Sequence, residues 1–419
     1  MSKKSLRHSI EFAFHVLAFI LLSGAFVTLW RNKTLGNIDP VEGDPVQRLL
    51  LGLAYMGIGL LVFHPRRAGQ LGRKGWLLWA LVGWALLSTL WSAAPEITLR
   101  RSLAAVLGLL YGLLLAVRYR PEEVLRMLGT ALAIVVVASL IAVVMVPDWA
   151  IMGFPHEGAW QGVLYHKNAL GRLCALALAV FWVLARAERS CRSVFWRVAM
   201  LIAGILVLGS RSATGLILAL ALPAGWWLLR AWSRLPGLLR PAAGSLAMAV
   251  FIPGLLVLPN IVESVLEFLG RDLTLTGRTP LWLASIPLAL ERPLLGYGYG
   301  AFWLGERGPS AAVWAVTWDA SHAHNGYLDL WLELGLIGAG LAFVLVVLTM
   351  VRYASAALQF KDIPIISFGF LVSLLIFVIN MSEAILLESG LAKAFYWVLF
   401  AYVYLLTLQK PARMNDNEP

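Results

Sequence analysis

The residues best suited to catalysis lie in one short stretch, Ser321–Gly335, with the sequence SHAHNGYLDLWLELG. It carries His322, His324, Asn325 and Asp329 in a segment that is otherwise largely apolar. Histidine is the side chain best suited to accept a proton from a hydroxyl group near neutral pH. At helical spacing His322 shares a face with Asn325 and Asp329, whereas His324 lies on another. We therefore expect the two histidines to differ in role.

The carboxylates of this stretch, Asp329 and Glu333, fall where the chain is expected to enter a membrane. Ionisable residues within a membrane are rare, and each is by default a candidate functional residue. Because a carboxylate beside a histidine or an arginine fixes its partner's orientation, we expect Asp329 to support the site and not to react itself.

Four cations lie at the expected ends of membrane helices. Arg211 falls in GSRSATG, Arg278 in TGRTPLW, and Lys167 and Arg172 in YHKNALGR, where His166 is their neighbour. Guanidinium groups match two phosphate oxygens at once and lysine acts as a point charge, so these four residues could hold a diphosphate. A helix-end arginine that only extends its charge to the membrane surface is the alternative interpretation of Arg211.

The composition shows which elements must position these residues. Of 419 residues, 60% are hydrophobic and only 14% are charged, against about 25% in soluble domains. We predict an all-α, polytopic integral membrane protein whose residues 1–419 form a single transmembrane domain. About twelve apolar runs predict its spans. They lie near 10–30, 47–63, 75–93, 102–117, 125–146, 168–185, 195–209, 212–229, 244–262, 323–350, 363–381 and 391–408.

The formal charge of +11 reflects orientation. With the N-terminus in the cytoplasm, 21 of the 34 lysines and arginines fall in cytoplasmic segments, as the positive-inside rule predicts. We therefore predict that both termini are cytoplasmic and that the first span is an uncleaved anchor. Because the basic residues are divided among short loops, no nucleic-acid partner is expected.

One outward segment is much longer than the others. Residues 263–321 form a predicted outward loop between spans nine and ten, far above the usual connection length. Within it, Thr279–Leu290 is apolar but too short to span a membrane, and Pro287 is expected to interrupt it. We expect short interfacial or re-entrant helices here.

Several competing motifs are weak. Asp319, His322 and His324 are zinc-type ligands, but no second cluster completes four ligands and the spacing matches no standard motif, so we expect no metal. Gly296–Gly300 (GYGYG) follows no strand of a βαβ unit and is expected to be a surface turn. The sequence contains no Walker-type phosphate loop, which argues against ATP hydrolysis by this chain.

The sequence resembles the superfamily of bacterial O-antigen ligases and O-antigen polymerases. The resemblance rests on the order of HKNALG, GSRSATG, TGRTPLW and HAHNGYLDLWLELGLIG and on the long outward loop before the last of them. It covers roughly residues 160–340, and the first five spans add only matching topology.

The resemblance implies a multi-pass enzyme of the Gram-negative inner membrane with a periplasmic active site. Such enzymes use neither metal nor ATP and no other cofactor, because the diphosphate linkage carries the energy. Their donor is a glycan on undecaprenyl diphosphate, and a ligase passes it to a sugar hydroxyl of lipid A-core, completing lipopolysaccharide. The length and the dominant outward loop resemble the ligases. An O-antigen polymerase is the first alternative and a lipid-linked glycan flippase the second.

The resemblance also implies roles for the residues above. His324 is expected to be the general base with His322 beside it, and Arg211 and Arg278 are expected to bind the diphosphate. Lys167 and Arg172 are weaker candidates for the diphosphate, and Asn325, Asp329 and His166 are expected to support the site. The sequence does not decide the donor and acceptor sugars, the stereochemical course or the oligomeric state.

Overall fold

A computed structural model describes residues 3–27, 44–189, 191–237, 278–360, 363–387 and 391–409. Within these ranges the chain is helical, and its β-structure is limited to one isolated bridge between Ile151 and Trp160. The predicted all-α class is therefore confirmed.

In the part of the chain that the structure describes, eight helices are long and apolar enough to cross a membrane, as the polytopic prediction requires. They are α1 (Lys3–Leu22), α3 (Pro45–Tyr55) with its continuation η1 (Met56–Phe63), α6 (Pro95–Arg118), α7 (Pro121–Met145), α9 (Lys167–Ala187), α10 (Cys191–Gly209), α11 (Ala213–Arg234) and α15 (Gly326–Gln359). Shorter apolar helices are α5 (Trp76–Leu87) with η2 (Ser88–Leu90), α16 (Pro364–Ile379) and α17 (Leu391–Leu406).

These helices match eleven of the predicted apolar runs. The remaining run, residues 244–262, lies outside the described residues, as do residues 263–277 of the long loop, so the total of twelve spans is not confirmed. Helices α6 and α7 begin several residues before their apolar runs, at Pro95 and Pro121. Proline suits the first helical position because its missing N–H has no intrahelical partner there.

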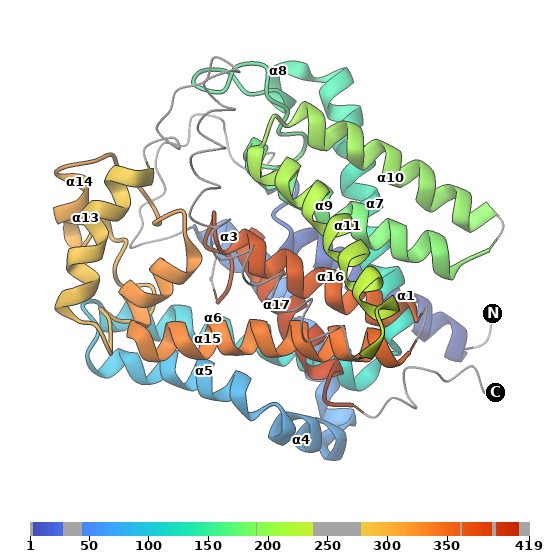
Figure 1. The fold of residues 1–419 in the computed structure, drawn as a ribbon, viewed down its shortest axis with the longest axis horizontal. Coiled ribbons are helices and arrows are strands. Elements are labelled where there is room, and N and C mark those ends of the chain that lie inside the picture. The colour runs from blue at the N-terminus through green and yellow to red at the C-terminus, as the bar shows by residue number, and fades with distance from the viewer. Residues whose placement is uncertain are drawn as a thin grey trace.

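Helix α9 lies within the bundle and connects its parts. It is the most enclosed of the eight candidate spans and packs against α7, α10, α11 and α16. Helix α17 packs against α6 and α16, and α15 against α5 and α16. Figure 1 shows α16 and α17 in the middle of the molecule, with α10 and α11 to one side and α5, α6 and α15 to the other.

The described part of the long loop, residues 278–321, and the short segment that follows it form a small core together with the start of α15. It contains α13 (Arg278–Glu291), η5 (Gly305–Arg307) and α14 (Ala311–Trp314), at the left of Figure 1. Leu281, Phe302 and Ala323 belong to this core and are fully buried. The expected interruption at Pro287 is wrong: α13 continues through it.

Helix α15 is kinked where this loop docks on it. Gly335 has φ +67°, and a Cβ there would collide with the carbonyl of Leu294. The kink lets the amides of Tyr297 and Gly298 donate to the carbonyls of Leu332 and Glu333, at 2.8 Å each. The Gly296–Gly300 segment is thus a turn, as predicted, but it is buried against α15 and does not lie at the surface. It fixes the loop on the helix that follows the two histidines.

Candidate active site

The two histidines lie in a short non-helical segment and not on the face of a helix. Helix α15 begins at Gly326, because the side chain of Asn325 accepts hydrogen bonds from the amides of Tyr327 and Leu328, at 3.1 and 3.2 Å. His324, just before this cap, has φ +52°. The expected helical spacing, which separated His322 from His324, is therefore wrong.

The backbone of Ala323, between the histidines, is held on both sides. Its amide donates to Asp329 Oδ1 at 2.9 Å, and its carbonyl accepts from Trp282 Nε1 at 2.7 Å. Asp329 Oδ1 also accepts from Trp303 Nε1 at 2.6 Å. Asp329 is buried, and the carboxylate expected to support the site binds the backbone of the histidine segment.

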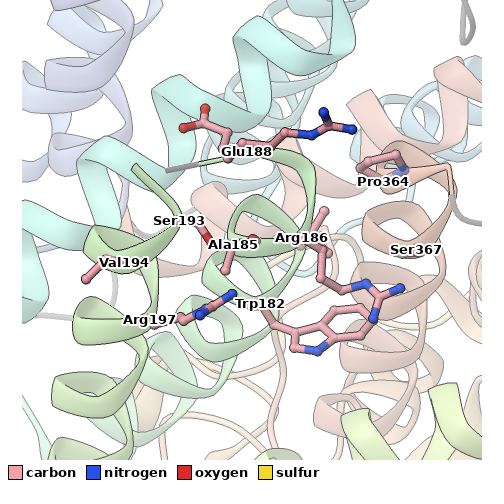
Figure 2. A pocket seen from close by; sticks show the side chains of 11 residues that line it. Trp182, Ala185, Arg186, Glu188, Ser193, Val194, Arg197, Pro364 and Ser367 are labelled. Carbon is pink, nitrogen blue, oxygen red and sulfur yellow. Dashed lines mark hydrogen bonds between the residues drawn. The ribbon is translucent and has the colours of Figure 1, made fainter. Parts of the chain in front are cut away.

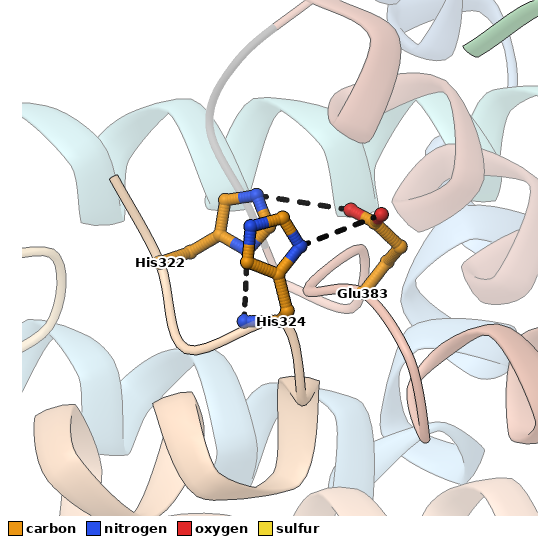
Figure 3. Close-up of side chains that lie close together, drawn as sticks. All are labelled: His322, His324 and Glu383. Atoms are coloured by element: carbon orange, nitrogen blue, oxygen red, sulfur yellow. Dashed lines mark hydrogen bonds and ion pairs between the residues drawn. The ribbon is translucent and has the colours of Figure 1, made fainter. Parts of the chain in front are cut away.

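Both imidazole rings face the carboxylate of Glu383. His324 Nδ1 lies 3.6 Å from Glu383 Oε1, and His322 Nε2 lies 3.7 Å from Oε2. The ring centroids of the two histidines are 4.0 Å apart (Figure 3). These carboxylate contacts are longer than good hydrogen bonds, a common state of catalytic groups before substrate binds.

Hydrogen-bond partners assign different tautomers to the two rings. His322 Nδ1 accepts from the amide of His324 at 3.1 Å, so its neutral ring carries the proton on Nε2, toward Glu383. His324 turns Nδ1 toward the same carboxylate, which favours the proton there and leaves Nε2 as a proton acceptor. Of the two, His324 therefore has the arrangement of a general base held by a carboxylate.

Glu383 is brought to the histidines by the turn that follows α16. Asn380 shapes this turn by accepting from the amides of Ile385 and Leu386, at 3.4 and 3.3 Å. The start of α15 rests directly on it, since the amide of Gly326 donates to the carbonyl of Asn380 at 2.8 Å. A Cβ at Gly326 would collide with the Asn380 side chain, so the absence of a side chain permits this contact.

Two arginines share the Glu383 carboxylate. Arg172 Nη1 lies 3.1 Å from Oε2 and Arg278 Nη2 lies 3.8 Å from Oε1. Burial alone would raise the pKa of Glu383, but Arg172 together with His324 and His322 outweighs it and lowers this pKa, so the group stays ionised. Burial lowers the pKa of Arg278, and its attraction to Glu383 offsets part of that effect.

Sequence reasoning missed Glu383 and Lys393. Lys393, near the start of α17, together with burial holds the pKa of His322 well below its ordinary value. Burial is the larger cause, so His322 stays neutral. The sequence contains a signal for both residues, because each is an isolated charge at the end of an apolar run. A charged residue in such a position is a candidate functional residue.

The other two predicted cations lie elsewhere around the start of α9. Lys167 is the first residue of that helix. Arg211 is exposed, has φ +48° and donates from Nη1 to the carbonyl of Glu157 at 3.3 Å. The turn of Arg211 is attached to α9 by Ser212, whose hydroxyl lies 3.0 Å from Asn168 Oδ1. Of the four cations, Arg172 and Arg278 therefore meet at Glu383, and no contact of Arg211 with that carboxylate is seen.

His166 caps α9. Its Nδ1 accepts from the amide of Asn168 at 3.2 Å, and its ring centroid is 5.3 Å from that of His156. Burial, with the nearby charges of His156 and Arg172, lowers the pKa of His166 to about 4. It therefore remains the neutral acceptor that the cap requires.

His322, His324 and Glu383 could also hold a metal, because their ligand atoms lie within 4.8 Å of one another. The sequence had offered Asp319 as the third ligand beside the two histidines, whereas the structure places Glu383 there. The surroundings favour a proton-transfer site, however, because Arg172 and Arg278 already supply positive charge to Glu383 and would repel a divalent cation. The arrangement can accept a proton at His324 and attract an anion at Arg278.

Two comparisons with known proteins agree on one family. The family described as O-antigen ligase matches residues 196–343, which include both histidines, Arg211 and Arg278. The exopolysaccharide production protein ExoQ of Rhizobium meliloti (strain 1021) is 30% identical over 329 residues, covering 74% of this chain and 71% of that protein.

Proposed function

Because the chain belongs to the O-antigen ligase superfamily, we propose that it transfers a glycan from undecaprenyl diphosphate to a sugar hydroxyl at the periplasmic face of a bacterial inner membrane. The family match and the ExoQ relative both support a polysaccharide ligase or polymerase type of function. The observation that carries the proposal is the pairing of His324 with Glu383, beside Arg278.

The proton chemistry follows from the assigned tautomers. His324 Nε2 accepts the proton of the acceptor hydroxyl, while Glu383 stabilises the imidazolium that forms. The hydroxyl oxygen forms a bond to the anomeric carbon of the donor sugar, and the bond from that carbon to the diphosphate oxygen breaks. The electron pair leaves with the undecaprenyl diphosphate, so neither a nucleotide nor a metal is needed.

The cations divide between two tasks. Arg172 is buried and close to Glu383, so it keeps that carboxylate ionised and oriented. Arg278 is only loosely paired, at 3.8 Å, and can turn to the leaving diphosphate, where Arg211 and Lys167 supply further positive charge. Charge placed where it develops in the transition state lowers the barrier without reorganisation.

The acceptor distinguishes two candidate functions. Ligation of O-antigen to lipid A-core is supported by the description of the matching family. Polymerisation, in which the hydroxyl belongs to another lipid-linked repeat unit, is supported by the relative named for exopolysaccharide production, which matches over most of both chains. Both reactions use the same base, carboxylate and cations.

Purified protein with undecaprenyl diphosphate-linked glycan tests the reaction and its acceptor together. We expect glycosidic product without nucleotide and in the presence of a metal chelator. A ladder on added rough lipopolysaccharide would identify a ligase, and longer lipid-linked glycan without that acceptor would identify a polymerase. Movement of the lipid-linked glycan across vesicles with no glycosidic product would contradict both and favour a flippase.

A further inference from the structure

A second concentration of arginines surrounds a cavity of about 560 Å³ at the far end of α9. Arg186, Arg189 and Arg197 line it, on the last turn of α9, the following link and the first turns of α10. Figure 2 shows Arg186 and Arg197 on neighbouring helices, with Pro364 and Ser367 of α16 opposite. The volume lies within the range of about 300–1,000 Å³ of ligand pockets.

The lining has a surplus of positive charge. Glu188 is the carboxylate among the described lining residues, and it is already engaged. Its Oε1 accepts from Arg126 Nε at 2.8 Å and its Oε2 from Trp196 Nε1 at 3.3 Å. Among the lining residues that the structure describes, three guanidiniums therefore accompany one carboxylate that is itself engaged. A phosphate group matches this surplus, because a guanidinium can bind two of its oxygens at once.

Aromatic and apolar side chains adjoin the cations. The guanidinium of Arg186 lies over the ring of Trp182, 5.1 Å from the centroid, and Trp182 packs edge-on against Trp226 at 5.9 Å. Val194, which also lines the cavity, is exposed. Tryptophan beside arginine at the end of a spanning helix is typical of the level where lipid headgroups meet hydrocarbon.

This cavity is separate from the histidine site. Arg172 lies on the second turn of α9 and Arg186 on its last turn. The 21 residues of α9 rise about 30 Å, which is the thickness of the hydrocarbon core. The two groups of arginines therefore belong to opposite faces of the membrane.

We propose that this cavity binds the phosphate of an anionic membrane phospholipid whose acyl chains lie against α10. Basic pockets between spanning helices recognise such headgroups. The lipid joins α9, α10 and α16 at the face opposite the histidines. This binding is independent of the glycan-transfer proposal.

Lipid titration of the purified, delipidated protein tests this site. Phosphatidylglycerol and phosphatidylcholine are added in turn, and bound lipid is counted by native mass spectrometry while the unfolding temperature is followed. We expect phosphatidylglycerol to bind at least about tenfold more tightly and to raise the unfolding temperature. The double variant Arg186→Gln/Arg197→Gln should lose this preference. The matched control Arg66→Gln/Arg73→Gln removes two charges from α4 (Pro65–Lys74), outside the cavity.

Three outcomes would overturn the proposal. The first is equal affinity of the double variant and the control for phosphatidylglycerol. The second is equal affinity of the wild type for both lipids. The third is full competition by inorganic phosphate, which would indicate a site for free anions. The single variant Arg197→Gln, at an exposed position, should weaken binding severalfold and keeps the test valid if the double variant does not fold.

Discussion

At the scale of single residues, the site depends on a carboxylate distant in sequence. His322, His324 and Asp329 could be found from the sequence because they interrupt an apolar segment within a few residues of one another. Glu383 could not be assigned to them, since a pairing across two helices leaves no local spacing signal. The tautomers also required coordinates, because they follow from the backbone contact between His324 and His322.

Glu383→Gln tests the carboxylate. The amide keeps the shape but can no longer stabilise an imidazolium, so we expect kcat to fall about 100-fold or more with little change in KM. Initial rates of glycan transfer by purified protein measure this. Glu306→Gln, at an exposed position of the same loop region, is the control and should retain full activity. A normal kcat in Glu383→Gln would exclude the proposed pairing.

At the scale of elements, the apolar runs predicted where the helices lie more accurately than where each helix begins and ends. Helices α6 and α7 continue through charged residues such as Arg101 and Glu122, because an apolar run marks the hydrocarbon layer and the helix extends into the polar interface. The cap at Asn325 determines the backbone geometry of the two histidines. It stops helical geometry before the histidines, and sequence spacing alone had extended the helix across them.

The His166 cap of α9 makes the free energy of unfolding depend on pH. The pKa of His166 is about 4 in the folded protein and about 6.5 when unfolded, so the unfolded state binds more protons between these values. Stability contributed by neutral His166 is complete above pH 6.5 and is lost as the pH falls toward 4. Between pH 7.5 and 5 this loss is about 2 kcal/mol.

The variant His166→Asn keeps a capping acceptor that does not titrate. We expect the unfolding free energy of the wild type to drop more than that of the variant between pH 7.5 and 5, measured by denaturant unfolding in detergent. Equal drops in both proteins would show that His166 is not held neutral.

At the scale of the whole molecule, composition alone identified a helical membrane protein. The charge distribution then predicted its orientation, with the histidine site outward and the link between α9 and α10 in the cytoplasm. The enclosed position of α9 could not be predicted in this way, because its sequence is no more apolar than that of its neighbours α7 and α10. Burial within a bundle depends on packing partners and not on hydropathy.

The exposed thiol of Cys191 reports the orientation. A membrane-impermeant maleimide should leave it unmodified in intact spheroplasts and label it in inverted vesicles. Glu306→Cys, on the opposite side, should show the reverse pattern, while buried Cys174 stays unlabelled in both. Labelling of Cys191 in intact spheroplasts would reverse the proposed topology.

The most direct test of the central claim is the rate of glycan transfer by His324→Gln, compared with His322→Gln, in the purified system. If His324 is the base, its variant should lose transfer by about 100-fold or more while remaining folded and able to bind the lipid-linked donor. The His322 variant should retain much more activity, because His322 carries its proton toward Glu383. A His324 variant with the wild-type transfer rate would contradict the account.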